Sequence, residues 1–338
     1  MRDPFVVNRL PLQRRDFLKG AAAFGLGAAL PFGAIRQVAA ADTPTLVNSI
    51  RSLTNPYHAT WNKGGAAFAK SVGAEYVTLV TEGNSEKGVA DIKAILSKTG
   101  GNCVINVDPN DSPDARPIVE ACKAAGAYVV TQWNKPNDLH PWDHDPNYVA
   151  HISFNGKPNG KAMAEALFKS MGGEGGIVAL GGILSNVPAI ERKQGLDEAL
   201  AANPKIKLLD FQVANWVSTE ALEKTNAWLT QYGDEIKGIW AANDDMALGA
   251  MEAVKARGLS GIAIIGFDAL PEALAQVRDG GMTATIEQFP GKQSSLGVQT
   301  LVSFLKDGTK PAEKVLLLTP EAVTKDNLNI AERLGEVK

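Results

Sequence analysis

The chain has 338 residues, of which 45% are hydrophobic and 21% charged. This balance is typical of a globular protein, and the length suffices for two domains that each have a core. The chain contains 34 Lys and Arg and 37 Asp and Glu. The first 41 residues hold six Lys/Arg and two Asp/Glu, so the remainder has 28 basic and 35 acidic residues and a net charge of about −7. That charge gives no indication of a nucleic-acid-binding face.

The N-terminus has the features of a twin-arginine export signal. The residues QRRDFLK (13–19) precede an apolar stretch rich in Gly and Ala (20–35), and small residues follow at 38–41. We expect a signal peptide over residues 1–41, cleavage near Ala41 and an exported mature protein. A membrane anchor is the alternative, which the short apolar run and the absence of a second apolar span disfavour.

The sequence contains two cysteines, Cys103 and Cys122, with no CxxC pair and no spacing typical of a metal site. A twin-arginine substrate folds before export, in a reducing compartment. We therefore expect two buried free thiols, with a disulfide as the alternative.

From residue 45 onward, short apolar runs alternate with stretches of helical periodicity. The expected strands are 46–50, 76–80, 103–107, 128–131, 148–153, 176–180, 206–212, 236–242, 262–266, 283–287 and 315–318. The expected helices are 57–72, 85–97, 117–125, 157–171, 187–202, 219–232, one between Asn243 and Gly258, 271–279 and 290–306. Such alternation predicts α/β architecture with parallel sheets covered on both faces, and the second set of strands repeats the first.

The segment 236–270 shows the pattern most clearly. Asn243 follows a strand and is suited to cap the next helix, while Phe267 and Asp268 directly follow the next strand. These three residues therefore stand at the carboxyl ends of neighbouring parallel strands, where open α/β sheets bind ligands. The alternative is that Asn243 only caps and Asp268 only forms a turn.

Polar and aromatic residues recur after other strands too. The candidate ligand-binding residues of this kind are Arg51, Asn55, Tyr57, His58, Trp133, Asn134, Trp216, Asn243, Phe267, Asp268 and Gln288. A cleft with aromatic walls, neutral amides and few charges is typical of carbohydrate binding. Structural alternatives stay open, among them a turn for Asn55, a helix start for Tyr57 and a bond across a hinge for Gln288.

The polar loop 132–146 contains the cluster HPWDHD (140–145). Its spacing matches no defensible set of metal ligands, so no metal and no cofactor is expected. We expect this loop to lean over the rim of the cleft, with His140 or Trp142 shaping the pocket.

Four segments together resemble the ribose-type periplasmic sugar-binding proteins, the solute receptors of ABC importers. They are SLTNPYHATWNKGGAAFAK (52–70), AANDDMALGAMEAVKARG (241–258), AIIGFDALPEA (263–273) and DGGMTATIEQFP (279–290). The resemblance implies two similar doubly wound parallel-sheet lobes, a three-stranded hinge and a ligand in the cleft between the lobes. It places crossings near 153–154, 288–289 and 319–320, so that the N-terminal lobe is 42–152 plus 289–318 and the C-terminal lobe is 153–288 plus 319–338.

The resemblance also places family binding positions on this chain. Asn55 stands at a hydroxyl-binding amide, Tyr57 at a stacking aromatic and His58 where a second aromatic is common; Trp216, Asn243, Phe267, Asp268 and Gln288 fall on further binding positions.

Two positions depart from a ribose binder. Trp133-Asn134 replaces an acid followed by arginine, and Ile190 replaces another arginine, for which Arg192 is a possible substitute. A different pentose, a hexose or a short polyol is therefore at least as well supported as ribose.

The expected function is capture of a small sugar or polyol in the periplasm and delivery to an ABC permease of the inner membrane, by a monomer. A sensor that feeds a chemotaxis or signalling receptor is the alternative. An exported enzyme is disfavoured because the sequence has no GxSxG, GxGxxG or P-loop motif. A sugar-responsive transcription regulator would carry a basic DNA-binding segment where this chain has its export signal.

Overall fold

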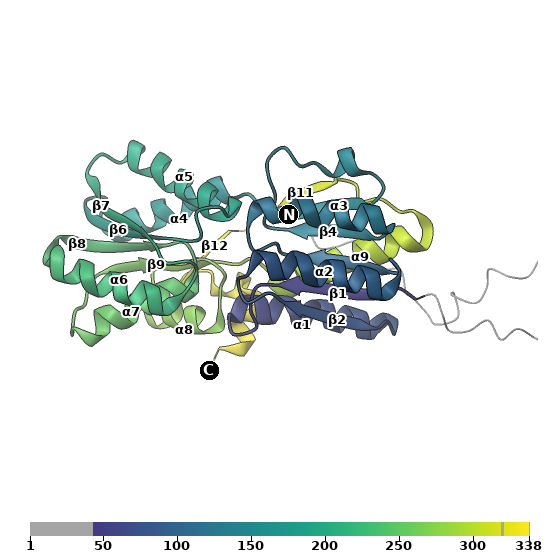
Figure 1. Ribbon diagram of the computed structural model, residues 1–338. Helices are drawn as coiled ribbons and strands as arrows, with labels where there is room; N and C mark the ends of the chain where they lie inside the picture. Colours follow the sequence, from purple (N-terminus) through teal and green to yellow (C-terminus); the bar gives the residue numbers. More distant parts are fainter. Residues whose placement is uncertain (1–42, 319–320, 338) are drawn as a thin grey trace, which may run out of the picture.

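Two six-stranded sheets lie side by side, each flanked by helices, in the computed structural model (Figure 1). It describes residues 43–318 and 321–337. The expected signal peptide (1–41) and the expected crossing at 319–320 lie outside the described residues.

The first sheet has the strand order β11-β5-β4-β3-β1-β2, and all of its pairs are parallel. Its strands are β1 Thr45–Ile50, β2 Tyr76–Val80, β3 Cys103–Val107, β4 Tyr128–Gln132, β5 Tyr148–Phe154 and β11 Val315–Leu318. β1, β3 and β5 are buried along their whole length, because helices cover both faces of the sheet. α1 (Pro56–Val72) packs with α9 (Pro290–Asp307), and α2 (Ser85–Thr99) with α3 (Ala115–Ala125).

The second sheet has the order β12-β10-β9-β8-β6-β7. Its strands are β6 Gly175–Gly181, β7 Ile206–Val213, β8 Ile236–Ala241, β9 Ala263–Ile265, β10 Ala284–Ile286 and β12 Ala322–Thr324. Only β12 runs antiparallel to its neighbour within the described part. Its helices are α4 Gly156–Ser170, which packs with α5 Val187–Ala202; α6 Ser218–Gln231, which packs with α7 Asp244–Ala256; and α8 Pro271–Asp279.

This architecture confirms the predicted α/β class with two parallel sheets. The chain passes from the first sheet to the second after β5 and returns after β10, where α9 packs on β3, β4 and β5. β12, of three residues, was not predicted. The exact lobe boundaries stay a prediction.

Buried aliphatic side chains form the cores on the faces of both sheets. Cys103 and Cys122 are buried in one of these cores, and their thiols are free. None of the helices within 43–318 and 321–337 is long and apolar enough to cross a membrane.

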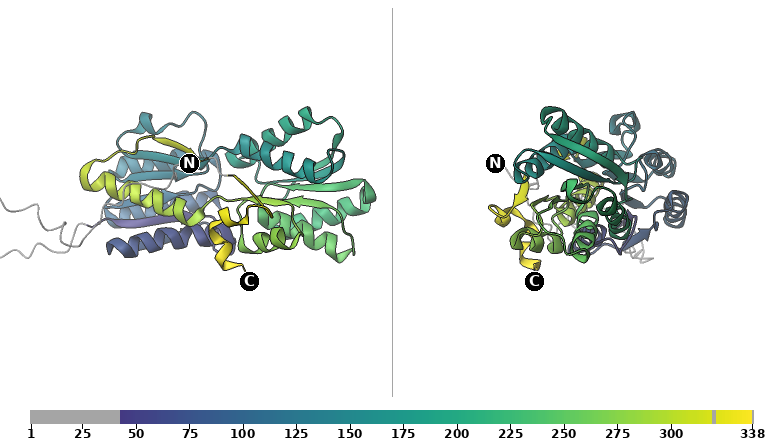
Figure 2. Two further views of the ribbon diagram at one scale, coloured as in Figure 1. Left: turned by 180° about the vertical axis from the view of Figure 1, so that it is seen from behind. Right: turned by 90° about the vertical axis from the view of Figure 1, so that its left-hand side faces the viewer.

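After β12 the chain forms the short 3-10 helices η5 (Leu328–Ile330) and η6 (Glu332–Glu336). Leu328, Ile330 and Leu334 pack on a small cluster with Val323, as expected of a packed terminal segment. In both Figure 1 and Figure 2 this segment lies beside the junction of the two lobes.

Candidate functional site

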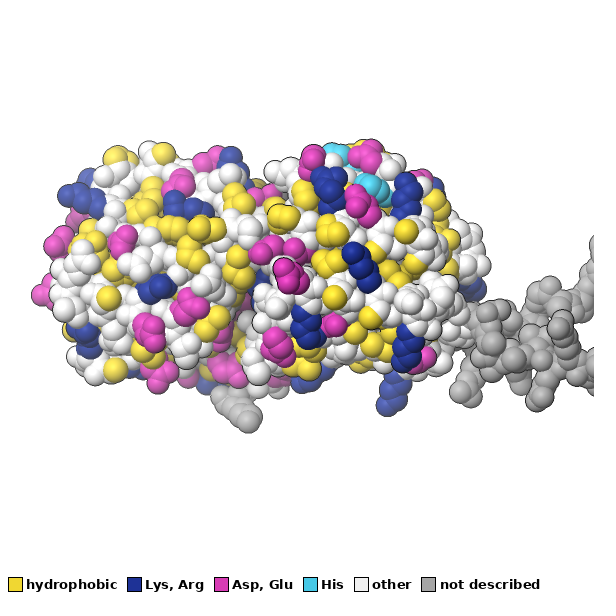
Figure 3. Space-filling model, in the orientation of Figure 1, with side chains coloured by type: hydrophobic (Ala, Val, Ile, Leu, Met, Phe, Trp, Pro, Cys, Tyr) yellow, Lys and Arg dark blue, Asp and Glu magenta, His cyan; other side chains and the backbone are white. Residues whose placement is uncertain are grey.

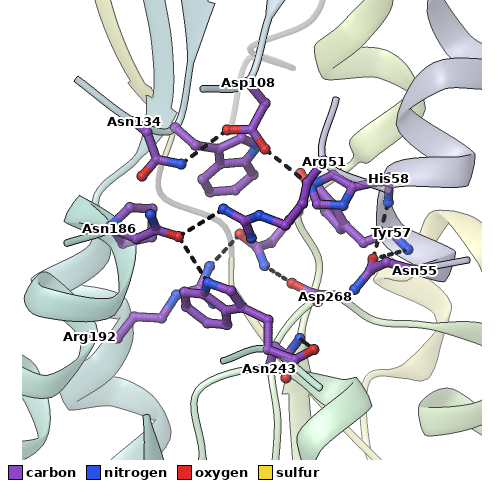
Figure 4. A pocket seen from close by; sticks show the side chains of 14 residues that line it. Arg51, Asn55, Tyr57, His58, Asp108, Asn134, Asn186, Arg192, Asn243 and Asp268 are labelled. Carbon is purple, nitrogen blue, oxygen red and sulfur yellow. Dashed lines mark hydrogen bonds and ion pairs between the residues drawn. The ribbon is translucent and has the colours of Figure 1, made fainter. Parts of the chain in front are cut away.

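A cavity lies where the carboxyl ends of strands from both sheets face each other (Figure 4). Its volume is about 70 Å³, several times the roughly 10–15 Å³ that one water molecule needs, so it can hold a small solute. The residues that line it are Arg51, Asn55, Tyr57, His58, Asp108, Trp133, Asn134, Asn186, Pro188, Arg192, Trp216, Asn243, Asp268 and Gln288. The structure thus brings together every residue predicted for the site except Phe267.

Two asparagines of the lining also cap helices. Asn55 Oδ1 accepts from the backbone N–H groups of Tyr57 and His58 at the start of α1, and Asn243 Oδ1 accepts from Met246 N at the start of α7. Since a cap uses only the amide oxygen, the capping and ligand-binding interpretations are compatible at both positions.

Aromatic rings form opposite walls of the cavity. On the side of the first sheet, Trp133 stacks on Phe154 with 4.7 Å between ring centroids and meets Tyr57 edge-on at 5.6 Å. On the side of the second sheet, the Trp216 indole packs against Gly182, where a Cβ atom would overlap the ring. Both walls are therefore held in place before a ligand arrives.

Three lining residues have unusual backbone conformations. Trp133, Trp216 and Asp268 have φ of 59°, 68° and 120°, values that non-glycine residues rarely adopt. Each such conformation costs on the order of 1–3 kcal/mol and is typical of functional sites. Here all three occur within three residues of a strand end, at side chains that line the cavity.

A buried polar chain crosses the floor of the cavity. Arg192 Nη2 donates to Gln288 Oε1 (2.8 Å), and Gln288 Nε2 donates to Asp268 Oδ1. Arg192 also donates to the carbonyl of Ala242. Burial raises the pKa of Asp268 well above its ordinary value, against the opposing effect of the nearby Arg192 charge, and burial likewise lowers the pKa of Arg192.

A second polar group joins the two sides of the cleft. Arg51 Nη2 donates to Asn110 O (2.6 Å) and to Asn186 Oδ1 (3.2 Å), which also accepts from Trp216 Nε1 (2.9 Å). Asn186 Nδ2 donates in turn to Asn110 O (2.8 Å). Asn186, at the start of α5, thereby links residues of both lobes.

His58, Asp108 and Asn134 form a third group. His58 Nε2 lies 3.1 Å from Asp108 Oδ2, and Asn134 Nδ2 donates to Asp108 Oδ1 at 3.1 Å. Four buried atoms of the lining have no hydrogen-bond partner among the described residues: Arg51 Nε, His58 Nδ1, Trp133 Nε1 and Asn134 Oδ1. Buried polar groups are nearly always paired, so these atoms mark where a polar ligand would bind.

Two expectations need correction. Phe267 is fully buried and does not line the cavity; its ring supports the Arg192 guanidinium, 4.6 Å from the ring centroid, and meets Trp240 edge-on. His140 and Trp142 stack on each other, and neither lines the cavity, so these two residues do not shape the pocket as expected. The described residues contain no cluster suited to a metal ion.

Sequence reasoning missed Asp108, Asn186 and Pro188. Asp108 follows β3 directly, so the signal used elsewhere would have found it. Asn186 and Pro188 lie at the start of α5, five or more residues beyond the end of β6 at Gly181, and no local pattern distinguishes them from ordinary helix-start residues.

Comparison with known proteins identifies the family. Residues 46–310 match the model of the periplasmic binding protein domain. The chain belongs to the periplasmic binding protein family. Residues 11–31 match the twin-arginine translocation signal, so this periplasmic binding protein is exported, and the predictions of family and export route are confirmed.

Its relatives include the xylitol-binding protein of Mycolicibacterium smegmatis (27% identity, 92% of this chain and 85% of the relative). The ribose import binding protein RbsB of Escherichia coli is 29% identical over 79% of this chain and 86% of its own. The Caulobacter myo-inositol binding protein, solved with myo-inositol, is 30% identical with a TM-score of 0.79, covering 92% and 100%. A twin-arginine translocation pathway signal protein of Burkholderia phytofirmans is 54% identical with a TM-score of 0.83, covering 88% and 94%.

These matches place the periplasmic binding protein among the solute receptors of ABC transporters for sugars and polyols. It is a binding protein and not an enzyme, as predicted.

Proposed function

We propose that this protein captures one neutral sugar or polyol in the cavity between its lobes and delivers it to an ABC permease of the inner membrane. The observation that carries the proposal is that four buried polar atoms of the cavity lining have no hydrogen-bond partner among the described residues, in a cavity that also has two aromatic walls. Arg51 Nε and Trp133 Nε1 are donors, Asn134 Oδ1 is an acceptor, and the ring nitrogen Nδ1 of His58 is the fourth atom. The hydroxyl groups of a sugar or polyol can pair with both the donor and the acceptor atoms, because each hydroxyl can donate one hydrogen bond and accept others.

The charged lining residues favour a neutral ligand. Arg192 is engaged by Gln288 and Ala242, and Asp108 by His58 and Asn134. A ligand carboxylate or ammonium would have to compete with these bonds in a buried site. The aromatic rings supply the apolar faces that the C–H side of a ring or polyol chain covers.

The departures at Trp133-Asn134 and Ile190 weaken the case for ribose as the ligand. Ile190 is exposed, whereas Arg192, two residues further along α5, lines the cavity and is our candidate substitute for the missing arginine. The relatives named for xylitol and myo-inositol support a polyol at least as well as the relative named for ribose. We propose a polyol or a sugar other than ribose, bound by the lining residues and released by opening of a monomer about the hinge.

The test is a thermal-shift screen of the purified mature protein against D-ribose, D-allose, xylitol, myo-inositol, other pentoses and hexoses, and tetritol to hexitol polyols. A ligand at a thousand times its Kd adds about 4 kcal/mol of stability. A single strong response, followed by calorimetry, would establish the ligand. No response from folded protein free of co-purified solute would contradict the proposal.

A further inference from the structure

The turn that carries Asp268 is held from several directions. Asp268 and Ala269 both have positive φ, 120° and 49°. Ala269 N donates to Thr285 Oγ1 (3.1 Å), and Leu270 N donates to Asp244 Oδ2 (2.9 Å). A strained turn persists only where its surroundings hold it, so these contacts determine where the Asp268 carboxylate points.

The C-terminal segment also contacts the turn. Arg333, in η6, is buried, and its Nη2 donates to the backbone carbonyl of Asp268, 65 residues away in the chain. The same guanidinium lies 3.9 Å from Glu287 Oε1. Glu287 in turn accepts from the backbone N–H groups of Gln288 (2.9 Å) and Glu332 (3.0 Å). One terminal segment thus contacts the backbone of both Asp268 and, through Glu287, Gln288.

Arg333 also supplies a positive charge behind the cavity wall. Asp244, Asp268 and Glu287 are buried acids, and the Arg333 charge opposes the rise in pKa that burial causes at each of them. Arg192 supplies a cation on the cavity side of Asp268. The acid that faces the cavity is therefore flanked by two buried arginines.

The geometry of Arg333 is a poor device for stability alone. Its Nε and Nη1 are buried and have no hydrogen-bond partner among the described residues. A buried guanidinium with unmade hydrogen bonds is costly, and an apolar residue would pack the segment more favourably.

We propose that Arg333 is a positioning residue for the ligand site: from the C-terminal segment it holds the Asp268 carbonyl and thereby directs the Asp268 side chain into the cavity. The inference rests on the proposed function, since it assigns the terminal segment to the same site. It implies that the segment around η6 is part of the binding machinery and not only a cap on the fold.

The experiment is calorimetric titration of the wild type, Arg333→Gln, Arg333→Lys, Asp268→Asn and the Arg333→Gln/Asp268→Asn double variant with D-ribose, D-allose, xylitol and myo-inositol. We expect Arg333→Gln to weaken the bound ligand about tenfold, which is about 1.4 kcal/mol of binding free energy. Arg333→Lys should restore part of the affinity. With Asp268→Asn already present, adding Arg333→Gln should change affinity by less than about twofold. The reason is that Arg333 acts on the ligand only through the Asp268 carboxylate, which Asp268→Asn has already removed.

Leu334→Ala is the matched control, because Leu334 packs in the same segment without a polar contact to Asp268. It should lower the unfolding midpoint as Arg333→Gln does, yet leave affinity within about twofold. Equal affinity of the wild type and Arg333→Gln would overturn the inference about Arg333 and leave the proposed function intact. So would binding free-energy changes of Arg333→Gln and Asp268→Asn that add up fully in the double variant. A wild type that binds neither these four compounds nor any other sugar or polyol of the thermal-shift screen would instead contradict the proposed function on which it rests; if the screen yields another ligand, the same variants are titrated with that ligand. Should Arg333→Gln fail to fold, Arg333→Lys and its cycle with Asp268→Asn carry the same test.

Discussion

At the scale of single residues, the site combines capping, strain and burial in the same side chains. Asn55 and Asn243 cap helices and line the cavity, while Trp133 and Trp216 hold left-handed backbone conformations next to it. Residues with two roles are poor candidates for clean tests, because their replacement also changes stability. The tryptophan rings are better, since Trp133 Nε1 has no partner and Trp216 packs from the opposite wall.

Replacement of Trp133 or Trp216 by Ala should therefore weaken ligand binding by about 1–3 kcal/mol, through the loss of aromatic contact area. Calorimetric titration with the ligand from the screen measures the change. Trp142→Ala is the control, because Trp142 is 55% exposed and does not line the cavity. Unchanged affinity in both cavity variants would show that these two rings do not contact the ligand.

At the scale of elements, two connections meet across the cleft beside the cavity. The segment after β3 and the segment before α5 are joined by Ser185 Oγ, which donates to Asp111 Oδ1 (2.6 Å), and by Val187 N, which donates to Ser112 Oγ (3.2 Å). These bonds form only when the lobes are together. We expect them to favour the closed state and to slow ligand release.

Ser185→Ala and Ser112→Ala should each speed ligand dissociation by about two- to tenfold, since one hydrogen bond contributes about 0.5–1.5 kcal/mol. The association rate should change little, because most interface variants act on dissociation. Stopped-flow tryptophan fluorescence measures both rates. Ser71→Ala, which removes a hydrogen bond within α1 only, is the control. Dissociation as slow as in the wild type would argue against a role of these bonds in closure.

At the scale of the whole molecule, the charge distribution and one buried histidine set the response to solution conditions. On the face shown in Figure 3, side chains of both signs are interspersed. His151, in the interior of the first sheet, bonds to Thr131 Oγ1 through Nδ1 (2.8 Å). Burial, with a smaller effect of Lys135, lowers the pKa of His151 from 6.5 to about 3.

The unfolded chain therefore binds a proton at His151 between pH 6.5 and about 3 that the folded protein does not bind. This group lowers the free energy of unfolding as the pH falls through that window, by about 1.4 kcal/mol per pH unit. The variant His151→Gln has no titratable group at this position. The free energy of unfolding of the wild type, minus that of this variant, should therefore fall by about 1.4 kcal/mol for each pH unit within the window. Urea unfolding of both proteins from pH 7 to pH 4 measures it, and parallel profiles would show that His151 does not titrate in this way.

Local patterns in the chain were enough to predict the α/β class, the strands of both sheets except β12, and most of the cavity lining. The reason is that periodicity and the position of a residue after a strand are local properties, and parallel strands bring their carboxyl ends to one edge. The direction in which a residue leaves that edge is not local: Phe267 and Asp268 are adjacent, yet only Asp268 faces the cavity. Contacts between distant segments, such as Asn186 with Arg51 and Arg333 with Asp268, depend on packing of the whole chain. No spacing in the sequence records them, so only the tertiary structure reveals them.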